Sequence, residues 1–200
     1  MNNSNINKQF ILGSGSERRI ELLRQIGVYP DLILKPNINE ECKLNEIPKD
    51  YVKRIAVEKN KIFQDKHPQS IILTADTVVS VGRRILHKAT EVKHAEECLK
   101  LISGRRHKVF TCFCLFSPNN KLKIKTVQSV VKFKRLDSNE ISYYLATNEW
   151  QGKAGAYGIQ GIAASFINFL SGSYSNVVGM PLAELYRMLL SIGYQFNNDR

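Results

Sequence analysis

Apolar residues along the 200-residue chain recur with two spacings, and each spacing predicts one kind of secondary structure. Spacings of three and four positions predict amphipathic helices over residues 17–26, 48–63, 90–102, 138–146 and 181–192. Short apolar and β-branched runs predict strands at 9–12, 70–74, 77–81, 109–116, 122–133 and 163–170. The chain thus opens as strand, glycine loop and helix, an order typical of α/β domains.

The glycine loop at 13–16 leads directly into a helix with two arginines in its first turn, Arg18 and Arg19. A helix start is already positive, so two cations there are unfavourable unless an anion such as phosphate binds. The loop has neither the Walker ending nor the Rossmann glycine pattern. The hydroxyls of Ser14 and Ser16 could help to hold a phosphate. Equally, Ser16 could only cap the helix while both arginines point to solvent.

Two carboxylates are candidates for chemistry. Asp76 interrupts an apolar strand pair, where an ionised group needs a cation to bind or a catalytic proton to hold. The alternative is that Asp76 lies in a turn and accepts hydrogen bonds from nearby amides. Glu40 could supply a second carboxylate to Mg²⁺ or Mn²⁺, or it could be solvated within its acidic loop.

Three lysines could neutralise a phosphate chain. Lys59 lies in the apolar stripe of its helix, where it could also reach past the core to water. Lys88 follows a short strand-like run. Lys153 stands in the glycine-rich run 152–161, whose small residues allow a backbone to bend closely around a ligand. We assign no chemical role to His107.

Composition narrows the class of protein. The hydrophobic content of 43% supports one sizeable core, and no apolar run approaches the length of a membrane span. Because residues 1–9 are also polar, we expect a soluble, cytoplasmic protein. The four cysteines are scattered, so we expect reduced thiols and no zinc site. The formal charge of +11 favours a polyanionic partner, yet the lysines are dispersed, so a solvated basic surface is favoured over a nucleic-acid stripe.

Six ordered segments together resemble the Maf family of nucleoside triphosphate pyrophosphatases over nearly the whole chain. The segments are 12–23, 51–59, 75–79, 103–111, 153–161 and 172–182. The resemblance implies an α/β fold with a long mixed β-sheet, flanking helices and a central cleft, similar to inosine triphosphate pyrophosphatases. It also implies a single domain over 1–200 with two lobes around that cleft, and a homodimer.

The resemblance further implies hydrolysis of a nucleoside triphosphate, with dTTP and UTP favoured, to the monophosphate and pyrophosphate. Asp76 falls on the position of the family's catalytic base. Arg18, Thr77 and Gln160 fall on positions typical of the dTTP and UTP branch. Further cleft positions are matched by Ser14, Ser16, Arg19, Glu40, Lys59, Lys88 and Lys153.

From these matches we expect the basic side chains to hold the triphosphate while Asp76 and Glu40 bind Mg²⁺ or Mn²⁺. Neither a membrane nor a nucleic acid is expected as a partner. The competing hypothesis is a non-catalytic nucleotide- or nucleic-acid-binding regulator of septum formation. Salt dependence separates the two, because binding to a duplex weakens steeply with ionic strength.

The chain departs from the family pattern at five positions, and the departures affect substrate preference more than reaction class. Glu17 adds a negative charge beside the expected phosphate site, where it lowers affinity or pairs with an arginine. The departures are Gly13 for alanine, Glu17 for proline, Asn37 and Asn39 for aspartates, and Ala89 for proline.

Overall fold

The computed structural model describes residues 8–119 and 121–196, which form a seven-stranded mixed β-sheet with helices. The strand order is β2-β1-β3-β5-β6-β7, with β4 paired to β3. This sheet confirms the predicted α/β fold class. The strands are β1 Phe10–Gly13, β2 Leu32–Ile33, β3 Ile71–Val81, β4 Arg84–Leu86, β5 Arg106–Ser117, β6 Lys121–Phe133 and β7 Ile167–Ser171. The helices are α1 Glu17–Gln25, α2 Pro48–Lys66, α3 Val92–Ile102, α4 Ser138–Ala146, α5 Tyr174–Val178 and α6 Leu182–Leu190, with the 3-10 helix η1 Ile162–Phe166.

The chain divides into two compact units. Unit 1 comprises Met1–Asp76, Thr111–Val127 and Gly179–Arg200, and unit 2 comprises Thr77–Phe110 and Gln128–Val178. The long strands β3, β5 and β6 each contribute residues to both units. Two lobes around a cleft remain a prediction.

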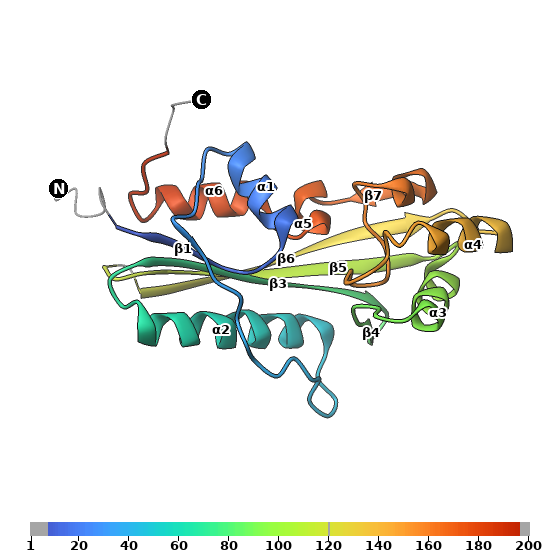
Figure 1. Cartoon of the computed structure of the whole chain (residues 1–200), viewed down its shortest axis with the longest axis horizontal. Coiled ribbons are helices and arrows are strands. Elements are labelled where there is room, and N and C mark those ends of the chain that lie inside the picture. The colour runs from blue at the N-terminus through green and yellow to red at the C-terminus, as the bar shows by residue number, and fades with distance from the viewer. Residues whose placement is uncertain (1–7, 120, 197–200) are drawn as a thin grey trace. The chain divides into compact units, whose positions relative to one another are not determined.

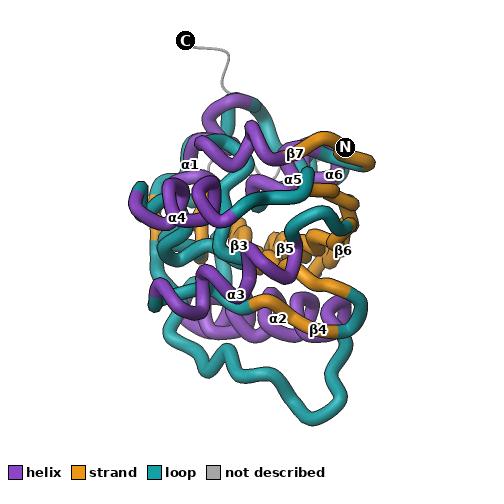
Figure 2. Tube along the Cα trace, turned by 90° about the vertical axis from the view of Figure 1, so that its right-hand side faces the viewer, coloured by secondary structure: helices purple, strands orange, loops and turns teal. Residues whose placement is uncertain are grey.

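In unit 1, helix α2 covers one face of the sheet, while α1 and α6 lie on the other face (Figures 1 and 2). The apolar stripe of α2 explains this packing, because the buried side of this 19-residue helix must meet an apolar sheet face. Ile11 of β1, Phe63 of α2 and Ile72 of β3 form a buried cluster there. The long segment between β2 and α2 contains no helix or strand.

The first three strands of unit 1 run parallel. Strand β1 pairs with β2 on one side and with β3 on the other, and Gly13 at its end lies opposite Thr74. A Cβ atom on Gly13 would lie 2.6 Å from the Phe63 ring and 2.6 Å from the Thr74 methyl group. The last residue of β1 is a glycine because the neighbouring side chains leave no space for a larger residue.

Unit 2 is organised around buried aromatic side chains. The Phe133 ring packs edge-on against Tyr157 at 4.9 Å and against His107 at 5.4 Å between ring centroids. The His107 Nε2 and Tyr157 Oη atoms are hydrogen-bonded at 2.8 Å, and burial lowers the pKa of His107 to about 4. Helix α4 begins with a capping box between Asp137 and Glu140.

Most predicted elements are confirmed to within a few residues, but two strand predictions were wrong. The runs 70–74 and 77–81 belong to one continuous strand, β3, so Asp76 does not lie in a turn. The first half of the predicted strand 163–170 is 3-10 helix η1, and only its second half belongs to β7. The short elements β2 and α5 were not predicted. None of the described helices is long and apolar enough to cross a bilayer.

Candidate functional site

The first turn of α1 in unit 1 contains a buried arginine that contacts the loop after β1. Arg19 is 9% exposed; its Nε donates to the Gly179 carbonyl oxygen and its Nη1 donates to Ser14 Oγ, each at 2.9 Å. Burial lowers the pKa of Arg19, and the charge of Arg18 lowers it further. The negative charges of Asp76 and Glu40 act in the opposite direction. The alternative of a solvent-directed Arg19 is therefore wrong.

Three further polar residues, Ser16, Glu17 and Arg18, precede Arg19 at the start of α1. Ser16 occupies the N-cap position, but its hydroxyl makes no capping hydrogen bond, so capping does not explain this serine. Arg18 is half-buried. Glu17 is exposed and forms no ion pair within the described part of the chain, so it does not neutralise either arginine.

Lys35 is a further cation at this loop, and the sequence analysis did not identify it. A Cβ atom on Gly15 would meet the Lys35 side chain at 2.6 Å, so this side chain lies across the loop. The Leu34 N–H donates to the Leu12 carbonyl oxygen at 2.9 Å, which fixes the chain just before Lys35. The missing signal was the two-residue strand β2, whose pairing with β1 sets this position.

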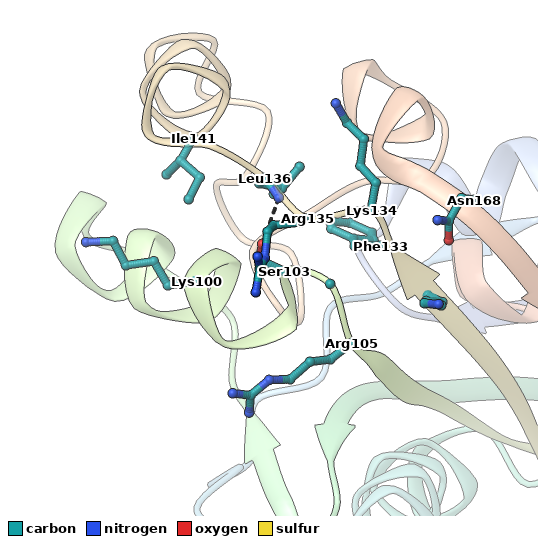
Figure 3. Close-up of a pocket in the computed structure, with 11 residues that line it drawn as sticks. Lys100, Ser103, Arg105, Phe133, Lys134, Arg135, Leu136, Ile141 and Asn168 are labelled. Atoms are coloured by element: carbon teal, nitrogen blue, oxygen red, sulfur yellow. Dashed lines mark hydrogen bonds between the residues drawn. The ribbon is translucent and has the colours of Figure 1, made fainter.

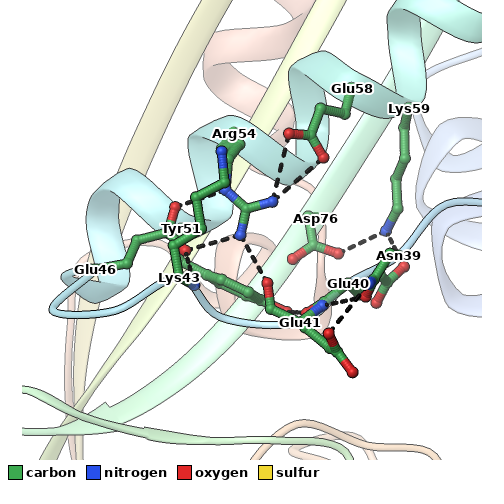
Figure 4. A network of polar contacts seen from close by, with 10 residues as sticks. All are labelled: Asn39, Glu40, Glu41, Lys43, Glu46, Tyr51, Arg54, Glu58, Lys59 and Asp76. Carbon is green, nitrogen blue, oxygen red and sulfur yellow. Dashed lines mark hydrogen bonds and ion pairs between the residues drawn. The ribbon is translucent and has the colours of Figure 1, made fainter.

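Asp76, Lys59 and Glu40 form the charged centre of unit 1 (Figure 4). Lys59 Nζ contacts Asp76 Oδ1 and Glu40 Oε1, each at 2.7 Å. The Lys59 and Asp76 side chains are both 5% exposed, whereas that of Glu40 is 36% exposed. Lys59 therefore does not reach past the core to water, and Glu40 is not simply a solvated loop residue. The Lys59 ammonium thus forms an ion pair with both carboxylates at once.

Helix α2 also fixes the loop that carries Glu40. The Tyr51 Oη donates to the Glu40 carbonyl oxygen at 2.8 Å. Arg54 donates from Nε and Nη2 to the two Glu46 carboxylate oxygens, both at 2.7 Å, and from Nη2 to the Glu41 carbonyl oxygen at 2.9 Å. The bond from Arg54 holds the pKa of Glu46 at about 2. Tyr51 and Arg54 are spaced i,i+3 and together hold the loop, while Lys59, further along α2, supplies the central cation.

The topology brings these groups to one edge of unit 1. The segment 14–19, which is the loop and the first turn of α1, follows β1. The segment 35–40 follows β2, and Asp76 stands two residues beyond the last β1-paired residue of β3. The carboxyl ends of neighbouring parallel strands meet at one edge, and ligands bind there in open α/β sheets. Cationic groups beside an acidic pair are suited to a phosphate group accompanied by a divalent cation.

Four of the predicted site residues belong to unit 2. Thr77 is half-buried and points to the opposite face of β3 from Asp76, because successive strand residues alternate. Lys88 is exposed and its backbone bridges to Ala154. Gln160 is exposed, and Lys153 donates from Nζ to the carbonyl oxygen of Glu149. In this structure Lys153 thus contacts its own loop.

The residues of unit 1 fit a divalent metal of the magnesium type. Glu40 and Asp76 offer hard carboxylate oxygens, which Mg²⁺ uses singly or in pairs together with phosphate oxygens and water. Within residues 8–119 and 121–196, no group of three or more histidine, cysteine or acidic side chains could hold a metal. The described donor set therefore matches a metal that a substrate's phosphates help to bind.

The fold and this cluster define an α/β protein with an acidic and basic site at the carboxyl ends of parallel strands. Residues 9–192 match the family described as Maf-like protein. The chain belongs to the Maf family.

Curated relatives of the chain are similar over nearly their full lengths. It is 51% identical to "dTTP/UTP pyrophosphatase" of Wolbachia sp. subsp. Drosophila simulans (strain wRi), over 94% of each chain. It is 48% identical to "Nucleoside triphosphate pyrophosphatase" of Ehrlichia chaffeensis, over 90% of this chain and 93% of the relative. Among solved structures, a dITP/XTP pyrophosphatase from Mycobacterium abscessus aligns with a TM-score of 0.45 at 14% identity, covering 92% of this chain and 97% of that chain.

Proposed function

We propose that this protein is a nucleoside triphosphate pyrophosphatase that hydrolyses dTTP or UTP to the nucleoside monophosphate and pyrophosphate. Family membership and the names of the relatives support the proposal. The observation that carries it is the pair of carboxylates on Lys59, beside the buried Arg19, where parallel strands end.

In the proposed reaction, Asp76 accepts a proton from a water molecule that attacks the α-phosphorus. A new bond forms between the water oxygen and this phosphorus, and the bond to the bridging oxygen of the β-phosphate breaks. Pyrophosphate leaves with the electron pair of that bond. Lys59 Nζ lies 2.7 Å from Asp76 Oδ1, and this contact would hold the carboxylate in place for the incoming water.

Arg18, Arg19 and the hydroxyls of Ser14 and Ser16 would bind the phosphate chain. Guanidinium groups suit this task because their fixed N–H donors match phosphate oxygens. Mg²⁺ or Mn²⁺, when held by Asp76 and Glu40, would neutralise charge on the phosphate oxygens.

On the resemblance alone, we propose that Thr77, Lys88, Lys153 and Gln160 also bind the nucleotide. Thr77 and Gln160 would contact the pyrimidine, and the two lysines would contact phosphates. A homodimer is proposed on the same basis and is tested by the mass of the particle in solution.

The test is to incubate the purified chain with dTTP, UTP, CTP, ATP or GTP and either metal ion, and to identify the products. We expect pyrophosphate and a monophosphate, with dTTP and UTP turned over fastest. Asp76→Asn should lower turnover by about 10²–10⁴-fold, as loss of a general base does. Asp65→Asn, an exposed aspartate on α2, is the matched control and should leave turnover unchanged.

Release of orthophosphate, or full activity of Asp76→Asn, would contradict the mechanism. Nucleotide binding without turnover would favour the regulator hypothesis instead. Titration with Mn²⁺ separates the two roles of Asp76, because a lost metal ligand is compensated by more metal and a lost base is not.

A further inference from the structure

Unit 2 contains a second basic feature that shares no residue with the proposed catalytic machinery. An open groove of about 720 Å³ lies between the end of α3, the start of β5 and the end of β6 (Figure 3). Five of its lining residues are cations and none is a carboxylate. These cations are Lys100, Arg105, Lys132, Lys134 and Arg135. We call this site the basic groove.

Neighbouring carboxylates neutralise only part of this charge. Lys100 pairs with Glu96 at 2.6 Å, and Lys134 pairs with Glu140. Arg105, Lys132 and Arg135 form no ion pair within the described part of the chain. Like charges gathered without counter-charges repel one another, so a bound polyanion would stabilise the groove.

The shape of the groove indicates what kind of polyanion fits. Its volume is that of a site for a small molecule. Phe133 is fully buried with its ring packed on His107 and Tyr157, so it offers no surface on which a base could stack. Non-specific binding of single-stranded nucleic acid normally relies on such stacking. The groove therefore offers charge and polar groups without a site for a base.

Polar groups of the groove complement the cations. Ser103 Oγ accepts a hydrogen bond from the Leu136 N–H at 2.8 Å, so the serine hydroxyl can still donate its own proton. Asn168 adds a side-chain amide to the lining. We propose that the basic groove binds a short chain of linked phosphates, either as inorganic oligophosphate or as the phosphate tail of a nucleotide.

The test is to titrate isotope-labelled full-length protein with inorganic tripolyphosphate and follow backbone amide resonances by NMR. Resonances of Gly104 and Arg135 report on the basic groove, and those of Ser14 and Arg19 report on unit 1. We expect both sets to shift. The double substitution Arg105→Gln with Arg135→Gln should weaken binding at the groove about tenfold while unit 1 still responds, since each exposed charge contributes modestly.

The matched control is Arg83→Gln with Lys93→Gln, which removes two exposed cations of unit 2 that do not line the groove. It should leave groove affinity within about twofold of the wild type. Thermal unfolding of both double variants checks that the fold is intact. The same titration is repeated with a non-hydrolysable UTP analogue. If the analogue shifts the groove resonances as tripolyphosphate does, the groove binds nucleotide phosphate tails as well as free oligophosphate.

Four results would overturn the proposal. These are shifts confined to unit 1, unchanged groove affinity in the arginine variant, binding of the UTP analogue without binding of tripolyphosphate, and tighter binding of a single-stranded oligonucleotide. The proposed pyrophosphatase activity can fail independently, because Asp76→Asn affects turnover and leaves the groove unchanged.

Discussion

Replacing Lys59 by methionine tests whether its ammonium holds the charged centre of unit 1 together. Methionine keeps most of the apolar stem that packs in α2 and removes only the charge. Asp76, whose side chain is 5% exposed, then loses the cation that lies 2.7 Å away. Glu40 loses the same partner, but its side chain is 36% exposed and water can replace the ammonium.

The two ion pairs differ in energy because their burial differs. At an effective dielectric constant of about 20, charges 2.7 Å apart attract by about 6 kcal/mol, most of which offsets the loss of hydration. Removing one partner of a buried pair costs about 3–5 kcal/mol because the remaining charge is uncompensated. Arg19 partly compensates Asp76, so we expect about 3 kcal/mol, or a melting temperature about 6–12 °C lower. Glu40→Gln should cost less than about 1 kcal/mol.

Urea unfolding at neutral pH measures these differences, with Lys61→Met on the exposed face of α2 as the control. Lys59→Met combined with Asp76→Asn should recover about 2 kcal/mol, since the uncompensated charge is gone, while turnover stays as low as in Asp76→Asn alone. The reasoning is refuted if Lys59→Met is as stable as Lys61→Met. It is equally refuted if the double variant is no more stable than Lys59→Met.

Three further predictions concern packing and pH. Gly13→Ala should cost about 1–3 kcal/mol in urea unfolding, and Phe63→Leu should relieve part of that cost; equal costs with and without the leucine would contradict the packing argument. Burial holds the pKa of His107 at about 4, below its ordinary 6.5, so the unfolded chain binds more protons between these values. Stability is complete above pH 6.5 and should fall by up to about 3 kcal/mol toward pH 4, and His107→Gln should flatten this profile. Arg54 holds the pKa of Glu46 at about 2, so this pair stabilises the fold above pH 4.5 and loses its effect as the pH falls toward 2; Arg54→Gln should raise the pH midpoint of acid unfolding, and an unchanged midpoint would exclude the contribution.

Local patterns in the sequence predicted the helices because each buries one stripe of apolar side chains. Helix α2 was found in this way, and the same stripe identified Lys59 as an unusual residue. The sequence pattern predicted two strands in place of β3, because a carboxylate within an apolar run normally marks the end of a strand. A sequence does not show that Lys59, 17 residues earlier, supplies the charge that lets Asp76 remain inside a strand.

Residues whose position depends on strand pairing could not be predicted. Lys35 reaches the loop after β1 only because β2 pairs with β1, and β2 is two residues long. Arg54 lies in the matched segment 51–59, but its role becomes visible only when Glu46 and the carbonyl group of Glu41 are in place. Such contacts join segments that are brought together by strand pairing and loop packing. The spacing of residues within each segment carries no information about them.

The asparagine at position 39 sharpens the metal prediction for this chain. Asn39 accepts a hydrogen bond from the Glu41 N–H at 2.8 Å and donates from Nδ2 to the Glu41 carboxylate at 3.1 Å. An aspartate could make the first of these bonds but not the second, because a carboxylate has no proton to donate. Glu41 is thereby held by Asn39, and Glu40 is the acidic residue of this loop that contacts Lys59. Asn39→Asp should therefore release Glu41 and add a second negative charge near Glu40, which would tighten Mn²⁺ binding measured by calorimetry. Unchanged Mn²⁺ affinity in Asn39→Asp, together with its loss in Glu40→Gln, would show that Glu40 and Asp76 set the affinity without help from the rest of the loop.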